Sequence, residues 1–190
     1  MKNNIRKYLN TYPIIDNSAY IDDSAVIIGD VVIGNNSSVW CNSVIRGDVN
    51  SITIGNNSNI QDLTMLHVSH KNPNKEPTEY GKLTIGDNVT VGHNCCLHAC
   101  TIKNNILVGM GTTILDNTII NDNILIGAGS LVPPNKELYS GYLYIGNPVK
   151  QVRQLSQEEI EYLEYSALHY VKVKNQYILE KENHESSIYN

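Results

Sequence analysis

The sequence lacks several features that would assign it to a membrane, a secretory route or a nucleic acid. No apolar run approaches the roughly 20 residues that a membrane span requires. The segment from Met1 to Tyr12 is polar and has no signal-peptide apolar stretch, so the expected location is the cytoplasm. The 14 Lys and Arg residues against 19 Asp and Glu make the chain mildly acidic, which argues against nucleic acid or an anionic membrane as its main partner.

The chain also lacks a CxxC pair. Its four cysteines lie inside aliphatic repeat segments, at Cys41, Cys95, Cys96 and Cys100. In a reducing compartment such cysteines are typically small buried fillers rather than disulfide partners or metal ligands. At 190 residues the chain has room for one domain with a substantial core, so 1–190 is expected to be a single domain.

What the sequence does contain is a six-residue repeat. Every sixth residue is aliphatic through four runs: Ile15, Ile21, Ile27, Ile33, Val39 and Ile45; Ile54, Ile60 and Leu66; Ile85, Val91 and Leu97; and Ile102, Val108, Ile114, Ile120, Ile126 and Val132. A period of six fits neither an α-helix nor a hairpin meander. It predicts a mainly β fold, a parallel β-helix whose triangular coils of three hexads stack about 4.8 Å apart with the aliphatic residues inside.

Interruptions of the repeat set the expected boundaries. We expect the β-helix over about 12–135, with a loop inserted at 68–82, where prolines, a glycine and charges break the pattern. Residues 136–155 are expected to be an extended linker. A capping box that begins at Ser156 predicts a C-terminal α-helix over 156–181, packed along the outside of the β-helix, with a frayed tail after it.

Two histidines should stack on one face of the coil. His67 follows Leu66 and His98 follows Leu97, so both occupy the same slot in adjacent coils. Two outward imidazoles about 4.8 Å apart at the backbone can share a metal at Zn–N distances of about 2.0–2.1 Å. His93 lies on another face, and a neighbouring chain could supply it more easily than its own chain. Head-to-tail packing of these faces closes as a three-fold ring, so we expect a homotrimer with intersubunit metal sites.

Other polar residues fall on the same faces. Arg46 occupies the slot of the stacked histidines one coil earlier, and Asp48 lies close to it. Asp62 stacks with His93, and Gln61 lies beside it. Two alternatives stay open: outward histidines are commonly surface residues, and Arg46 with Asp48 could be a purely structural ion pair.

The strings IRGDVNSITIGNNSNIQDLTMLHV and VGHNCCLHACTI resemble the γ-class carbonic anhydrase family. The resemblance covers roughly residues 10–175 and includes LVPPNKELYSGYLYIGNPVKQVRQLS, which is close to the bacterial carbonic-anhydrase-like branch of the hexapeptide-repeat proteins. Its specificity comes from the combination of RGD, QD-x4-H and GH-x4-H. The resemblance implies that the β-helix is left-handed.

The resemblance also implies a metal centre and a reaction. The ligands would be His67, His93 and His98, two from one subunit and one from the next, holding Zn²⁺, with Fe²⁺ or Co²⁺ as other possible occupants. Three histidines leave a position open for water. The expected activity is that of a lyase, in which a metal-bound hydroxide attacks CO2 and gives bicarbonate.

Further roles follow from the resemblance. Gln61 would hydrogen-bond the metal-bound water, and Asp62 would support the neighbouring site. Arg46 and Asp48 would pair across the subunit interface, with Arg46 also near the anionic product. Tyr170 is the candidate polar side chain from the C-terminal helix, unless it merely packs there.

The sequence departs from the family near the site. The best-known active members carry an acidic residue just after the RGD-type motif, where this chain has Val49, and an acidic loop for moving protons. Here the loop is mixed in charge, with Lys71, Lys75, Glu76 and Glu79. Either glutamate could carry a proton, but solvated surface charge is the simpler interpretation. CO2 hydration is therefore expected to be slow or absent.

Three other functions stay open. The fold also suits a hexapeptide acyltransferase, which needs a catalytic histidine free of metal and a groove for coenzyme A. A metal-dependent thioesterase would use the same metal site. A non-enzymatic, metal-stabilised accessory protein would have no open coordination position.

Overall fold

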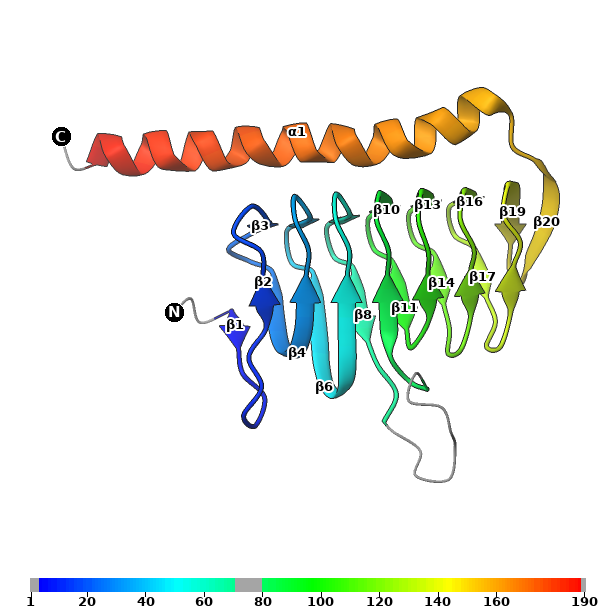
Figure 1. Cartoon of the computed structure of the whole chain (residues 1–190), viewed down its shortest axis with the longest axis horizontal. Helices are drawn as coiled ribbons and strands as arrows, with labels where there is room; N and C mark the ends of the chain where they lie inside the picture. The colour runs from blue at the N-terminus through cyan, green and yellow to red at the C-terminus, as the bar shows by residue number, and fades with distance from the viewer. Residues whose placement is uncertain (1–3, 71–79, 189–190) are drawn as a thin grey trace.

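The computed structural model is an elongated prism of stacked coils with one long helix along its side (Figure 1). It describes residues 4–70 and 80–188, with side chains described as far as residue 183. Helix α1 (Gln157–Ile188) runs back along the prism, so both ends of the described chain lie at the same end of the molecule (Figure 1).

Two sheets form the walls of the prism. In both, strands pair in parallel from one coil to the next, except for β19 and β20, which are antiparallel. The 12-stranded sheet contains β1 (Ile5–Arg6), β2 (Ile14–Ile15), β4 (Val26–Ile33), β6 (Val44–Ile54), β8 (Met65–His67), β9 (Leu83–Ile85), β11 (Cys96–His98), β12 (Thr101–Ile102), β14 (Thr113–Ile114), β15 (Ile119–Ile120), β17 (Leu131–Val132) and β18 (Glu137–Leu138). The 8-stranded sheet contains β3 (Tyr20–Ile21), β5 (Ser38–Val39), β7 (Asn59–Ile60), β10 (Val89–Val91), β13 (Ile106–Val108), β16 (Ile124–Ile126), β19 (Tyr142–Gly146) and β20 (Val149–Gln154).

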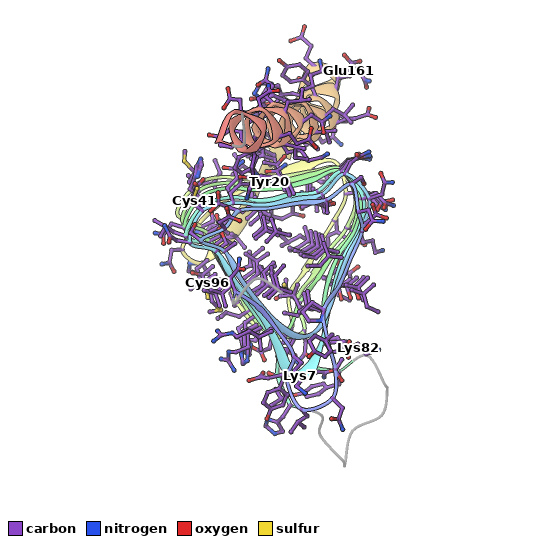
Figure 2. All side chains as sticks on the ribbon, turned by 90° about the vertical axis from the view of Figure 1, so that its left-hand side faces the viewer. Lys7, Tyr20, Cys41, Lys82, Cys96 and Glu161 are labelled. Atoms are coloured by element: carbon purple, nitrogen blue, oxygen red, sulfur yellow. The ribbon has the colours of Figure 1, made fainter. Side chains whose placement is uncertain are left out.

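The predicted coil register is confirmed. The aliphatic residues of the second run pair in order with those of the third: Ile54 with Ile85, Ile60 with Val91, and Leu66 with Leu97. All six are at most 1% exposed, and side chains fill the interior of the prism in stacked rows (Figure 2). The core is therefore a column of aliphatic layers, and each layer fixes the one above it.

Asparagine makes the corners of the coil. Nine asparagines have φ between 53° and 59°, a left-handed conformation that Asn tolerates better than most residues: Asn36, Asn42, Asn57, Asn88, Asn94, Asn105, Asn117, Asn123 and Asn135. Their side chains also bond along the axis. Asn57 Nδ2 donates to Asn88 Oδ1, and Asn88 Nδ2 donates to Asn105 Oδ1, each at 3.1 Å. The same residue type thus supplies both the turn and a ladder between coils.

The prediction of an extended linker at 136–155 is wrong. β18 continues the parallel ladder, and β19 and β20 form a hairpin that closes the C-terminal end of the prism. The hexad register in fact runs on from Val132 to Leu138 and Tyr144, both buried. Prolines at 133 and 134 do not end the coil, because β17 finishes at Val132 before them.

Helix α1 begins as predicted but ends later. The Ser156 hydroxyl accepts from the Glu159 amide at 3.2 Å, and the Glu159 carboxylate accepts from the Ser156 amide at 2.9 Å, which is the expected capping box. The helix continues to Ile188 instead of fraying after Lys181, since no helix-breaking residue follows and Lys181 pairs with Asp23 of the β-helix. It packs on the 8-stranded sheet, against β3, β5, β10 and β13.

The four cysteines are free thiols. Cys95 and Cys100 are buried, but Cys41 and Cys96 are partly exposed, so the filler role is wrong for the latter two. Cys96 precedes the inward Leu97 on β11, and alternation turns it outward. Over the part of the chain that the structure describes, no helix has the length and apolarity to cross a membrane.

The corner asparagines give a direct test of the fold. Asn105→Gly removes the ladder contact but keeps the left-handed corner accessible, whereas Asn105→Ala also imposes a left-handed penalty of about 1 kcal/mol. The alanine variant should therefore be the less stable of the two in urea unfolding. An alanine variant as stable as the glycine variant would contradict this account of the corners.

Candidate metal centre

The stacked histidines meet as the register predicts. His67 on β8 pairs with His98 on β11, and Arg46 on β6 pairs with His67 from the other side. His67 Nδ1 lies 3.1 Å from His98 Nε2, and the two rings are tilted by 48° with their centroids 5.2 Å apart. One nitrogen of each ring therefore points at the same small volume between the coils.

A carboxylate engages the other nitrogen of each ring. Asp48 Oδ1 lies 3.0 Å from His67 Nε2, and Asp116 Oδ2 lies 2.9 Å from His98 Nδ1. Burial raises the pKa of Asp48, but hydrogen bonds from His67 and Arg46 outweigh burial and hold this pKa below its ordinary value. Burial likewise raises the pKa of Asp116, and hydrogen bonds from Ser69 and His98 lower it further than burial raises it. Both groups are therefore carboxylates at neutral pH and accept a ring N–H.

These carboxylates set whether the two facing ring nitrogens act as donors or as acceptors. A neutral imidazole that donates from one nitrogen presents a lone pair on the other. His67 Nδ1 and His98 Nε2 are then two acceptors facing each other at 3.1 Å, an arrangement that calls for a proton or a cation between them. Two nitrogens bound to one tetrahedral zinc at 2.0–2.1 Å stand about 3.3 Å apart. The pair therefore fits two ligands of one zinc-type cation.

His93 belongs to a different face, as predicted. Its Nδ1 lies 2.7 Å from Asp62 Oδ2, so Nε2 is the nitrogen left for a ligand. The side chain is 44% exposed, and within residues 4–70 and 80–188 no three His, Cys, Asp or Glu residues come close enough to hold a metal. Within a single chain, then, His93 remains apart from the stacked pair.

Gln61 and Tyr170 lie beside His93. All three line a hollow of about 410 Å³ between α1 and the 8-stranded sheet. Gln61 is buried, and its Nε2 donates to Asn59 Oδ1 at 3.1 Å. Tyr170 packs edge-on against Trp40, and burial followed by the charge of Asp62 raises the pKa of its hydroxyl. The structure thus brings both predicted residues to His93 rather than to the stacked pair of the same chain.

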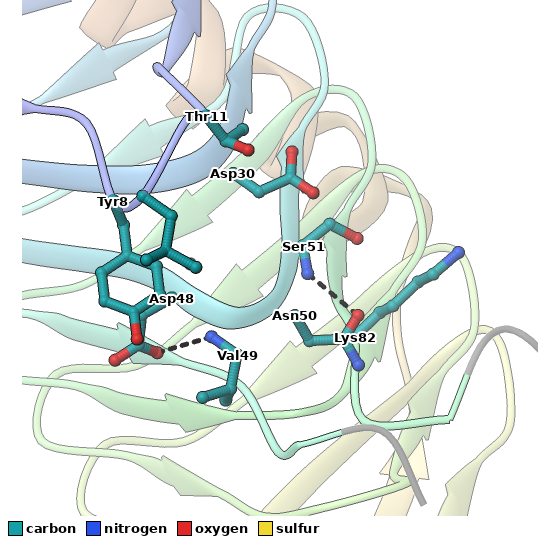
Figure 3. A pocket seen from close by; sticks show the side chains of 10 residues that line it. Tyr8, Thr11, Asp30, Asp48, Val49, Asn50, Ser51 and Lys82 are labelled. Carbon is teal, nitrogen blue, oxygen red and sulfur yellow. Dashed lines mark hydrogen bonds between the residues drawn. The ribbon is translucent and has the colours of Figure 1, made fainter. Parts of the chain in front are cut away.

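Arg46 and Asp48 pair within the chain, through Arg46 Nη1 and Asp48 Oδ2. Their pairing across an interface stays a prediction. Asp48 also borders a second hollow, of about 360 Å³, which is lined by Tyr8 and Thr11 near the N-terminus and has Lys82 on its wall (Figure 3). Asp48 therefore joins three features: the guanidinium, a candidate metal ligand and a polar cavity.

Asp116 and Ser69 are the site residues that sequence reasoning missed. Ser69 Oγ donates to Asp116 Oδ1 at 2.5 Å, while the other carboxylate oxygen engages His98. The hexad spacing does not point to Asp116, because the ladder advances by 17 residues here, from Leu97 to Ile114, and Asp116 lies one position past the counterpart of His98. The glutamates considered for proton transfer, Glu76 and Glu79, and the other charged loop residues, Lys71 and Lys75, lie outside the described residues.

Comparison with known proteins agrees with the fold and with the resemblance to the γ-class carbonic anhydrases. The family described as bacterial transferase hexapeptide (six repeats) matches residues 12–47. The protein YrdA of Escherichia coli is 52% identical over 181 residues, 94% of this chain and 96% of that protein. A carbonic anhydrase of Geobacillus kaustophilus is 44% identical, covering 91% of this chain and 90% of its own length. The mitochondrial gamma carbonic anhydrase 2 of Arabidopsis thaliana is 43% identical, and the match spans 85% of this chain and 57% of that protein.

Solved structures share the same architecture. A hexapeptide transferase family protein from Anaplasma phagocytophilum superposes with a TM-score of 0.85 at 40% identity, covering 93% of this chain and 99% of that one. A putative acetyltransferase of Bacillus cereus gives 0.83, also at 40% identity, over 91% of this chain and 95% of that one.

Removing the charge of Asp116 tests the metal centre. Asp116→Asn should weaken zinc binding by about 10–100-fold, because outer carboxylates orient a ligating histidine and raise its basicity. Competition with a chromophoric chelator measures the affinity. The matched control is Asp122→Asn, a partly exposed carboxylate that, among the described residues, accepts hydrogen bonds from Asn104. Equal affinity in the Asp116 variant and the wild type would contradict the role of Asp116 in orienting His98 as a ligand.

Proposed function

Because the chain belongs to the γ-class carbonic anhydrase family of hexapeptide-repeat proteins, we propose that it is a metal-dependent lyase that interconverts CO2 and bicarbonate. The observation that carries the proposal is the convergence of His67 Nδ1 and His98 Nε2 at 3.1 Å. Zn²⁺ is the proposed occupant, with Fe²⁺ or Co²⁺ as other candidates. Such a cation, when bound, supplies Lewis acidity and makes hydroxide available at neutral pH.

The proposed site is completed by a second copy of the chain. His93 stands on a different face from the stacked pair, with Nε2 left for a ligand by the contact between Nδ1 and Asp62. Packing that face against the stacked pair of a neighbour, repeated head to tail, closes as a three-fold ring. The proposal is therefore a homotrimer with three sites, each with two histidines from one subunit and His93 from the next.

The remaining residues have roles that their contacts support. CO2 hydration adds hydroxide to a neutral carbon and creates an anion, so a guanidinium close to the site favours the product. Arg46, paired with Asp48 and stacked on the slot of His67, is the proposed guanidinium. Gln61 offers an amide that can orient the attacking hydroxyl, and Tyr170 closes the hollow from the side of α1.

Turnover is proposed to be slow. Each hydration releases a proton that has to leave the site. Val49 is 43% exposed, and by resemblance it stands where the best-known active members of the family carry an acidic residue. A carboxylate at this position is thus unavailable as a proton carrier, and buffer in the solvent would have to accept the proton.

Acyl transfer is the second candidate. The contact between Asp62 and His93 resembles a general base oriented by a carboxylate, and similar solved structures are described as transferases. The described residues that line the hollow beside His93 include no charged side chain, whereas a coenzyme A thioester carries several phosphate charges. Hydration is therefore the better-supported proposal.

His98→Ala tests the proposed function. The variant should lose the single bound metal per chain and all CO2 hydration above background, because one of two converging nitrogens is gone. Metal analysis and stopped-flow hydration assays on anaerobically prepared protein measure both. The control is His169→Ala, an exposed histidine on α1 that packs on Tyr165 and Tyr170.

Two results would count against the proposal. One is a fully metallated wild type that hydrates CO2 no faster than buffer. The other is saturable acetyl-CoA binding that persists in His98→Ala and disappears in His93→Ala, which would favour acyl transfer.

A further inference from the structure

A buried chain of hydrogen bonds links Gln61 to helix α1. Gln61 Nε2 donates to Asn59 Oδ1 at 3.1 Å, and Asn59 Nδ2 donates to Thr90 Oγ1 at 3.0 Å. Thr90 Oγ1 lies 3.2 Å from Ser166 Oγ on α1. The four residues are only 1–9% exposed, so water does not compete for these contacts. The chain crosses two coils of the β-helix and ends on the helix that covers them.

The direction of the donors matters for Gln61. An amide has one acceptor oxygen and one donor nitrogen, and the two are exchanged if the group flips. Thr90 and Ser166 are hydroxyls, and Thr90 accepts from the nitrogen of Asn59, so the oxygen of Asn59 is left to accept from Gln61. That contact uses one N–H of the Gln61 amide, directs its nitrogen toward Asn59 and leaves its oxygen as the acceptor available to the hollow shared with His93.

The polar contact with α1 is not what helix packing alone requires. Leu163 and Ala167 occupy the same inner face of the helix and are fully buried. A hydroxyl pair in such an interface contributes little net stability, because both groups give up hydrogen bonds to water, and apolar groups of the same shape serve equally well. The position of Thr90 and Ser166 at the end of the hydrogen-bond chain from Gln61 therefore points to a role in the site.

We propose that Thr90 and Ser166 are positioning residues, which act through Asn59 to hold the Gln61 amide with its oxygen toward the reacting hydroxyl. This inference rests on the proposed CO2 hydration at a site that includes Gln61. It makes α1 a part of the site, because the last group of the chain is carried by the helix.

Substitutions at Thr90 separate positioning from packing. Thr90→Val keeps the shape of the side chain and removes the hydroxyl, and it should lower kcat for hydration about tenfold with KM and metal content unchanged. Thr90→Ser restores the hydroxyl and should restore kcat. The matched control is Thr112→Val, a fully buried threonine whose hydroxyl donates to the Gly127 carbonyl within the described structure, and it should leave kcat unchanged.

A double-mutant cycle shows whether the effect passes through Gln61. In a Gln61→Leu background, Thr90→Val should cause no further loss, since the group that it positions is gone. Losses that multiply in the double variant would mean that Thr90 acts independently, and equal kcat in Thr90→Val and the wild type would overturn the inference while leaving CO2 hydration standing.

A measurement without turnover keeps the two proposals apart. Hydrogen exchange of the Gln61 side-chain amide, followed by NMR in the metal-free protein, should be slow in the wild type and in Thr90→Ser. It should be about tenfold faster in Thr90→Val and Ser166→Ala, because Asn59 is then no longer fixed by Thr90 and holds the Gln61 amide less firmly. Unchanged exchange overturns the positioning role even if the enzyme is active. Faster exchange in an inactive protein supports the positioning role and contradicts only the proposed hydration.

Discussion

The hydrogen-bond ladder between successive coils is the constraint on which the rest of the structure depends. It fixes a register in which each inward aliphatic residue stacks on its counterpart, as Leu66 does on Leu97, and the neighbouring outward residues must then stack as well. His67 and His98 come together for this reason, with no loop to place them. A slip of one residue would turn both histidines into the core, so the apolar interior protects the geometry of the site.

Carboxylates turn this stack of histidines into a ligand pair. Asp48 and Asp116 each bind the outer nitrogen of one ring, and the inner nitrogens are left as acceptors at 3.1 Å. Asp62 does the same for His93 on another face. Each of the three histidines thus has its own carboxylate, and all three are prepared to bind a cation through the free nitrogen. Every chain therefore carries both parts that the proposed shared site requires, the pair of His67 and His98 and the separate His93.

Much of this could be predicted from the hexads alone. The register placed His67 over His98 and Asp62 beside His93, because a repeat of six converts sequence distance directly into position on the prism. The predicted end of the repeat at Val132 is wrong, because Leu138 and Tyr144 continue the six-residue spacing and are buried. Asp116 could not be predicted in this way, because the coil from Leu97 to Ile114 has 17 residues and Asp116 lies one position past the slot of His98. The chain from Gln61 to Ser166 needs the helix docked on the sheet, which no local pattern encodes.

The central claim is that two chains share each metal site, and mixed trimers of two inactive variants test it most directly. A His93→Ala chain keeps the pair of His67 and His98, and a His98→Ala chain keeps His93. An interface that combines the pair of the first chain with His93 of the second therefore has all three ligands. Refolding the two variants together in equal amounts should restore about a quarter of the wild-type metal content and hydration, the fraction of interfaces with the intact combination. A mixture with no more metal than either variant alone would contradict a site shared between chains.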